Sequence, residues 1–201
     1  MDVGPDDPPH GGPVSEKDIL HRYLDEAREA LRWKLDGLSE YDVRRPLTPH
    51  GTNLLGLVKH LSGCEMGYFG AVFGRPFPDP PAWLSSDVPD ADMWATPDES
   101  REGIVDLYRR ACAHADETIR TRDLDAVGEV PPWPPERRRV TLHQILVHMI
   151  AETSRHAGHA DIVRELVDGS TGRLPGERQT ADPAYWSRLH RCIEDSARRF
   201  R

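Results

Sequence analysis

Hydrophobic residues recur every three or four positions over most of the chain, which is the spacing of one face of an α-helix. No period-two alternation typical of a strand, no Asn-Gly hairpin and no internal repeat stands out. The pattern therefore predicts an all-α four-helix bundle with an extra C-terminal helix. The helices are expected over residues 15–37, 52–74, 96–122, 141–169 and 183–199.

Capping residues mark several of these boundaries. Thr96, Pro97 and Glu99 fit the N-cap, N1 and N3 positions of a capping box. Gly74 suits the residue just past the end of the second helix. In the first helix, Gly37 and the "SEYD" segment that follows it are expected to end the helix.

The connection between the second and third helices, residues 75–95, is rich in proline and long for a compact domain. Such a segment is typical of a crossover or of a loop that covers a site. A crossover would return the chain to the same end of the bundle, so that the second and third helices run parallel.

The composition of the chain argues against several classes of protein. The chain has 201 residues, with 34 acidic and 26 basic side chains and a net charge of −8, which argues against a general nucleic-acid binder. It lacks an apolar run near 18 residues, so no membrane span is expected. The N-terminus is acidic and rich in Pro and Gly, which predicts a disordered tail over 1–14, no signal peptide and a cytoplasmic protein. Residues 15–201 are expected to form a single domain, with its three scattered cysteines reduced.

The fourth long helix carries a polar stripe. At about 100° per residue, His148, Glu152, His156 and His159 fall within about 80° of one another on its surface. Ile145 lies within the same stripe, so these polar groups interrupt a partly apolar face. A helix face of this kind points toward other helices as readily as toward water.

Glu152 and His156 are four residues apart, so their side chains emerge about 6 Å apart and could bind one ion. The obvious third ligand is His60, on the largely apolar helix over 52–74. Two histidines and one carboxylate with open positions suit Zn²⁺, and also Ni²⁺ or Fe²⁺. Cys64, one turn after His60, is either a fourth ligand or part of the core.

A solvated helix face with paired side chains would show the same spacing, and a single histidine is usually a surface or hydrogen-bonded residue. The motifs of three other enzyme classes are absent from the sequence. The chain contains no HExxH motif of a zinc protease, no paired Glu-x-x-His set of a di-iron bundle and no GxSxG elbow of a serine hydrolase.

The segments "GLVKHL" and "HMIAETSRHAGHAD" resemble motifs of the DinB/YfiT-like metalloenzyme superfamily, and the resemblance covers roughly residues 17–172. It is closest to the branch related to mycothiol-dependent maleylpyruvate isomerase. The resemblance implies a homodimeric four-helix bundle with long crossover loops, and a divalent metal, most often zinc, held by three residues at one end. The ligands would be His60, Glu152 and His156, with Glu152 standing where many members have histidine. His148 and His159 match no family ligand and would contact a ligand or the substrate.

By this resemblance, the function would be that of a thiol S-transferase or isomerase, in which the metal activates a mycothiol-like cosubstrate toward a small electrophile. One alternative is a metal-dependent hydrolase with a metal-bound water as nucleophile. Another is a non-catalytic dimeric bundle whose metal is structural. A closed four-ligand shell that includes Cys64 or His159 would favour the structural role, and an open position would favour catalysis.

Overall fold

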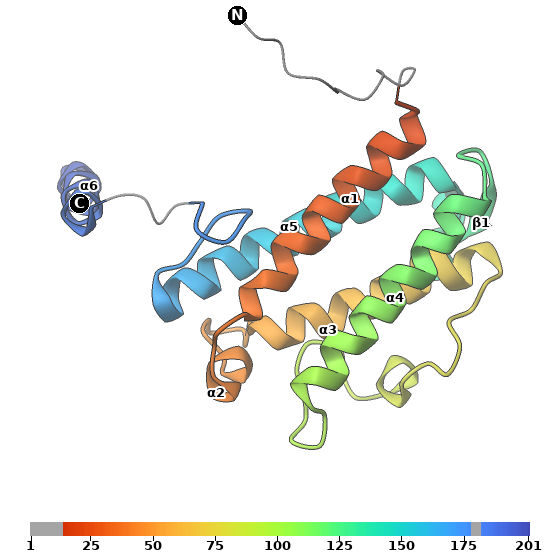
Figure 1. Cartoon of the computed structure of the whole chain (residues 1–201), viewed down its shortest axis with the longest axis horizontal. Coiled ribbons are helices and arrows are strands. Elements are labelled where there is room, and N and C mark those ends of the chain that lie inside the picture. The colour runs from red at the N-terminus through yellow and green to blue at the C-terminus, as the bar shows by residue number, and fades with distance from the viewer. Residues whose placement is uncertain (1–13, 178–181) are drawn as a thin grey trace, which may run out of the picture.

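Four long helices pack lengthwise in the computed structural model, as the hydrophobic spacing predicts (Figure 1). They are α1 (Glu16–Arg32), α3 (Leu54–Glu65), α4 (Arg101–Thr121) and α5 (Leu142–Asp168). The structure describes residues 14–177 and 182–201, so nearly all of the tail expected over 1–14 lies outside the described residues. The expected all-α bundle is confirmed.

The long crossover makes α3 and α4 run parallel to one another. Lys59, in the middle of α3, lies 2.8 Å from Glu99, just before the start of α4. The helical run that begins with α3 continues to Phe73, and residues 54–73 together are called the third-helix segment. Arg75, just beyond its end, hydrogen bonds to Thr118 near the end of α4. The two helices therefore run in the same direction, with residues 75–100 returning the chain between them (Figure 1). The predicted crossover is confirmed.

Helices α1 and α5 form the second parallel pair and run opposite to the first. Lys34, two residues after α1, lies 2.8 Å from Asp161 near the end of α5. Arg164 of α5 donates hydrogen bonds of 2.8 Å to the carbonyl oxygens of Lys34 and Asp36. The C-terminal ends of α1 and α5 are thereby fixed side by side.

Two helix boundaries differ from the predicted ones. The "SEYD" segment does not only end the first helix: Ser39 caps a short helix, α2 (Glu40–Arg44), that the hydrophobic spacing did not reveal. Helix α4 begins at Arg101 with Ser100 as its N-cap, rather than near Thr96. Glu99 does accept a hydrogen bond from the Thr96 backbone, as a capping box requires, but only a turn follows, and the Glu99 carboxylate also pairs with Lys59.

Two three-residue strands, β1 (Val127–Glu129) and β2 (Arg139–Thr141), pair antiparallel in the second proline-rich connection. Strands this short leave no alternation for sequence analysis to detect, and none was predicted. Gly128 allows β1 to lie against the end of the third-helix segment, since a Cβ there would lie 2.6 Å from the Val72 carbonyl oxygen. The ribbon thereby closes one end of the bundle.

The core consists mainly of aliphatic side chains from all four long helices. Leu31, Leu57, Leu61 and Ala160 belong to one buried cluster, and Leu24 belongs to a second that lies nearer the β-ribbon. Burial of these side chains is the main favourable contribution to the stability of the bundle.

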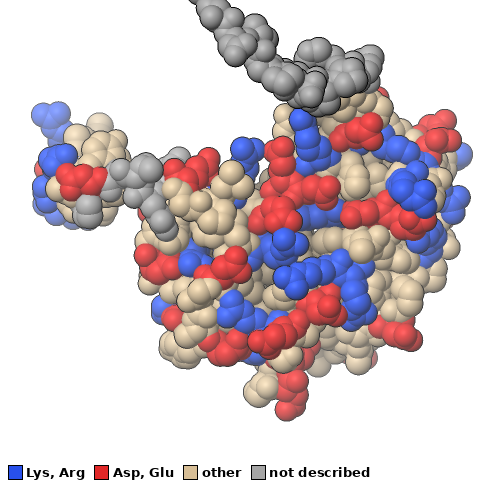
Figure 2. All heavy atoms as spheres, in the orientation of Figure 1, with Lys and Arg blue, Asp and Glu red and all other residues tan. Residues whose placement is uncertain are grey.

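The predicted C-terminal helix is present as α6 (Pro183–Arg198), capped by Asp182. It is drawn end-on in Figure 1, beyond the end of α5 and apart from the four long helices. In the part of the chain that the structure describes, no helix is long and apolar enough to cross a membrane. Acidic and basic side chains alternate over the face of the molecule that Figure 2 shows.

Candidate metal centre

Three side chains from two helices converge where α3 packs against α5. His60 comes from α3, and Glu152 and His156 come from successive turns of α5. Each offers one ligand atom, and these atoms all lie within 4.8 Å of one another. The structure thus brings together the three residues that the spacing and the resemblance single out. They lie near the middle of α5, whereas the resemblance suggests a site at one end of the bundle.

The carboxylate of Glu152 is the centre of this cluster. Its Oε1 lies 3.0 Å from Nε2 of His156 and 3.6 Å from Nε2 of His60. The two imidazole rings meet edge to face, with centroids 4.9 Å apart. The side chains are 21% exposed for His60, 29% for Glu152 and 11% for His156, so the cluster is sheltered but open on one side.

Electrostatics favour an ionised Glu152 beside a neutral His156. Burial acts to raise the pKa of the Glu152 carboxyl, but hydrogen bonding and charge interactions with His156 and His60 outweigh it and lower the pKa. Burial and the neighbouring His60 lower the pKa of His156. Ionised carboxylate and neutral imidazole are the forms that bind a metal ion.

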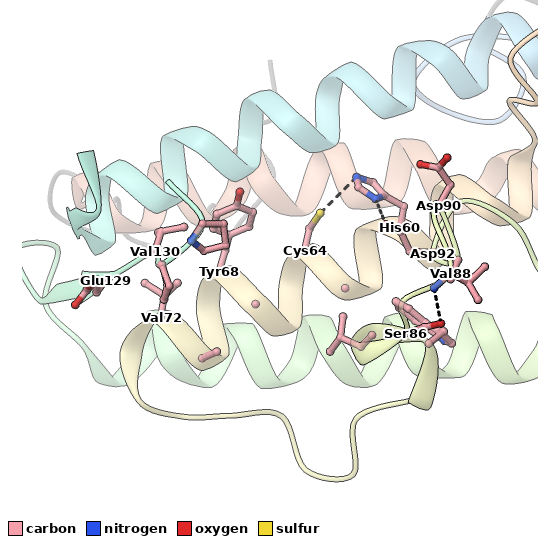
Figure 3. A pocket seen from close by; sticks show the side chains of 18 residues that line it. His60, Cys64, Tyr68, Val72, Ser86, Val88, Asp90, Asp92, Glu129 and Val130 are labelled. Atoms are coloured by element: carbon pink, nitrogen blue, oxygen red, sulfur yellow. Dashed lines mark hydrogen bonds and ion pairs between the residues drawn. The ribbon is translucent and has the colours of Figure 1, made fainter. Parts of the chain in front are cut away.

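An aspartate orients His60. Nδ1 of His60 lies 2.7 Å from Oδ2 of Asp92, which belongs to the crossover segment (Figure 3). An ionised carboxylate can only accept a hydrogen bond, so Nδ1 carries the hydrogen and Nε2 is left with a free lone pair. Nε2 is also the atom that faces Glu152. This arrangement, a carboxylate behind an imidazole, is characteristic of histidines that bind metals.

His159 and His148 occupy different surroundings. Nδ1 of His159 lies 3.4 Å from Nδ1 of His156, where it can orient that ring from behind. The His148 ring lies outside the cluster and packs against two aromatic rings, with centroids 4.6 Å from Tyr68 and 5.1 Å from Trp133. Burial is the main cause that lowers the pKa of His148. The polar stripe of α5 therefore contributes side chains to two neighbouring places: the ligand cluster and an aromatic contact beside it.

Cys64 lies beside the cluster without joining it. Its Sγ is 3.5 Å from Nε2 of His60 (Figure 3). Burial and the carboxylate of Glu152 raise the pKa of this thiol to about 12. Cys64 is therefore protonated at neutral pH in this structure, and a protonated thiol is a poor ligand and a poor nucleophile.

A cavity of about 640 Å³ opens next to His60. Figure 3 shows His60, Cys64 and Tyr68 on successive turns of the third-helix segment, all facing this space. A π-helical turn over Met66–Gly70 interrupts the α-helix here, and such turns are frequent at functional sites. The remaining walls come from the crossover segment and the end of the β-ribbon, and include Trp83, Leu84, Val88, Asp90, Glu129 and Val130.

The crossover segment is fastened to α3 close to the cluster. Gly56 has room only for hydrogen, because a Cβ there would lie 1.8 Å from the carbonyl oxygen of Met93. Asn53 and Lys59 donate hydrogen bonds to the backbone carbonyls of Met93 and Trp94, at 3.0 and 2.9 Å. These contacts position Asp92, the residue just before Met93. Asp92 is the functional candidate that sequence reasoning missed, because an irregular loop offers no periodic signal.

A second group of possible ligands, His21, Asp25 and Asp116, has a different explanation. Arg28 donates hydrogen bonds to both aspartates, at 2.8 and 2.7 Å, and also forms a bidentate pair with buried Glu65. A fixed guanidinium already supplies the positive charge that a metal would bring. This group is therefore an ion-pair network that connects α1, α3 and α4.

Comparisons with known proteins agree with the fold. A family model described as mycothiol-S-transferase matches residues 19–169. No curated protein matches the chain. Among solved structures, a conserved protein from Enterococcus faecalis is similar, with a TM-score of 0.60 and 19% identity over 79% of this chain and 100% of that one. This identity supports a shared fold alone. The match over residues 19–169 shows that the chain belongs to the mycothiol S-transferase family, a DinB/YfiT-like family.

Proposed function

We propose that this protein is a divalent-metal-dependent S-transferase that joins a mycothiol-like thiol to a small electrophile. The observation that carries the proposal is the convergence of His60, Glu152 and His156 beside a cavity that His60 itself lines. The family match supports a mycothiol-related transferase. Zinc as the metal, a homodimer and a cytoplasmic location are further predictions that follow from the resemblance.

The donor set fits a divalent transition metal. Two imidazole nitrogens and one carboxylate oxygen, with a cavity on one side, are the ligands of a three-coordinate protein site that keeps a position for substrate. Asp92 and His159 lie behind the two imidazoles, where the partners of ligating histidines are usually found. A bound divalent cation would supply the positive charge that stabilises the cosubstrate thiol as its thiolate at neutral pH.

The residues of the chain set up the rest of the reaction. Glu152 brings one negative charge to the centre, while Asp92 holds the tautomer of His60 that leaves Nε2 free. Burial and the carboxylate of Glu152 raise the pKa of the Cys64 thiol, which opposes its use as the nucleophile in place of the cosubstrate. The apolar walls of the cavity exclude water and hold the electrophile against the attacking sulfur.

The test is turnover of 4-nitrobenzyl chloride by the metal-loaded protein, measured with and without mycothiol. The proposal predicts thioether formation that requires the thiol and is lost in His60→Ala and Glu152→Ala. Glu165→Ala, an exposed change on the same helix, is the matched control and keeps full activity. Turnover that needs no thiol would favour the metal-dependent hydrolase instead. Activity that survives loss of His60 or Glu152 would contradict the proposed site.

A further inference from the structure

The cavity beside the cluster has negative but no positive side-chain charge. Three carboxylates line it, those of Asp90, Asp92 and Glu129, and no Lys or Arg does so among the residues that the structure describes. The carboxylate of Asp92 is hydrogen bonded to His60. Within the described ranges, the carboxylates of Asp90 and Glu129 form no hydrogen bond or ion pair, and both residues are exposed. Figure 3 shows them at opposite ends of the lining.

Two cations close to the cavity are committed to other contacts. Lys59 is 1% exposed, pairs with Glu99 at 2.8 Å, and lines a different cavity behind Trp83. The guanidinium of Arg137 lies over the Trp133 ring, 5.7 Å from its centroid. Neither belongs to the lining of the cavity beside His60. A carboxylate placed in this cavity would therefore meet like charge without a compensating side chain.

The proposed metal would not reverse this balance once the thiol is bound. A dication held by one carboxylate and one thiolate is formally neutral. The rest of the lining is apolar or aromatic, including Tyr68, Val72, Trp83 and Val130. Apolar walls with few polar groups favour a compact hydrophobic ligand, and exposed carboxylates in the lining favour a positive end.

We infer that this cavity selects electrophiles with an apolar, aryl-sized body and a neutral or positively charged end, and discriminates against those that carry a carboxylate. That the ligand is an electrophile rests on the proposed function, whereas the charge preference belongs to the cavity itself. The inference separates this chain from the isomerase branch that its sequence resembles, because a dicarboxylate substrate would face Asp90 and Glu129.

The reaction with such a substrate is balanced without any further reagent. For a para-substituted benzyl chloride, the thiolate sulfur forms a bond to the benzylic carbon. The carbon–chlorine bond breaks at the same time, and its electron pair leaves with chloride. The proton of the thiol is released to solvent, and nothing is oxidised or reduced.

Binding is measured first, because it does not depend on turnover. Calorimetry on the metal-loaded protein saturated with mycothiol compares three unreactive probes: benzyltrimethylammonium, benzyl alcohol and phenylacetate. The expected result is that the cation and the alcohol bind about tenfold or more tightly than phenylacetate, as two exposed carboxylates can provide. The Asp90→Asn/Glu129→Gln variant should bring the ratio close to one. Asp87→Asn, exposed on the same segment but outside the lining, should leave the ratio unchanged.

Three results would overturn the inference: phenylacetate that binds as tightly as the other probes, a ratio that the double variant does not change, or no binding by any probe. Turnover of benzyl chlorides with trimethylammonio, hydroxymethyl or carboxylate groups in the para position then tests the proposed function separately. If the binding ratio holds but no chloride is turned over with thiol, the proposed function fails and the charge preference stands. If the carboxylate is turned over fastest, the inference fails and the proposed function stands.

Discussion

Nδ1 of His60 lies 2.7 Å from Oδ2 of Asp92, although 32 positions separate the two residues in the chain. His60 belongs to a regular helix, and Asp92 to the irregular segment that returns the chain along the bundle. The contact leaves Nε2 free to face Glu152. One hydrogen bond thus links the crossover segment, which also forms a wall of the cavity, to the proposed metal centre.

Replacement of Asp92 by Asn should weaken metal binding without removing it. The amide keeps the shape but loses the charge that fixes the hydrogen on Nδ1 of His60. Changes to such partners typically lower metal affinity about 10–100-fold. Competition with a chromophoric chelator measures the affinity. Asp87→Asn, on the same segment and exposed, is the control, and an equal loss in both variants would argue against a specific role for Asp92.

Replacement of Glu152 and replacement of His148, both in the polar stripe of α5, should have different effects on metal affinity. Glu152→Gln removes the only anionic ligand and should lower affinity by about 100-fold or more, beyond the range for partners of ligands. His148→Ala, one turn earlier, should leave affinity unchanged, since its ring packs against Tyr68 and Trp133 instead. Equilibrium dialysis with metal analysis distinguishes the two. A larger loss for His148→Ala would show that the proposed ligand set is wrong.

Removal of one partner from the buried Arg28–Glu65 pair should strongly destabilise the bundle. Glu65 is fully buried and accepts two hydrogen bonds from Arg28, at 2.8 and 2.7 Å. Glu65→Leu leaves the guanidinium buried without its main partner, which typically costs about 3–5 kcal/mol. The free energy of unfolding in urea measures this cost. The Arg28→Met/Glu65→Leu double variant should be more stable than Glu65→Leu alone, and the opposite order would contradict the explanation.

The His21–Asp116 pair should make stability depend on pH. The hydrogen bond that His21 donates to Asp116 raises the pKa of His21 above 6.5, so its stabilisation is complete below pH 6.5 and is lost as pH rises through the raised value. Burial opposes ionisation of Asp116, but His21 and Arg28 outweigh it and lower that pKa. His21→Gln should therefore destabilise the protein by about 1 kcal/mol at pH 5.5, since both side chains are partly exposed, and by less at pH 8.5.

Thermal unfolding of the wild type and His21→Gln at the two pH values tests this. An equal difference in melting temperature at pH 5.5 and 8.5 would mean that the charged pair does not contribute. The nearby Glu117 is partly exposed and its side chain pairs only with Arg120 of its own helix among the described residues, so Glu117→Gln serves as a control on α4.

The parts of the fold that sequence predicts are those with local causes. Hydrophobic spacing located the long helices. Thr141 and Gly169 mark the two ends of α5, because a capping side chain and a left-handed residue each end a helix through contacts within one turn. The angular positions of Glu152 and His156 also follow from one helix. That His60 is the residue opposite them needed the resemblance as well as the spacing, since packing between helices is not local.

The parts that sequence did not predict depend on contacts between distant segments. The two strands are each three residues long and are ordered by pairing with one another and packing near Val72. Ser100 caps α4, and Glu99 just before it pairs with Lys59 of α3, 40 positions away in the chain. Asp92 reaches His60 because Gly56, Asn53 and Lys59 hold the adjacent backbone. No periodic pattern in the chain encodes these relationships.

The most direct test of the central claim is a titration of the Co²⁺-substituted protein with mycothiol, followed by absorption spectroscopy. The account predicts one Co²⁺ per chain and no thiolate-to-cobalt charge-transfer band before the thiol is added, because Cys64 is not one of the three proposed ligands. The band should then appear with added thiol and saturate at one equivalent. A band before addition would indicate a closed site that includes Cys64. No band after addition, or the same band in His60→Ala/Glu152→Ala, would contradict the claim that these residues form a thiol-activating metal centre.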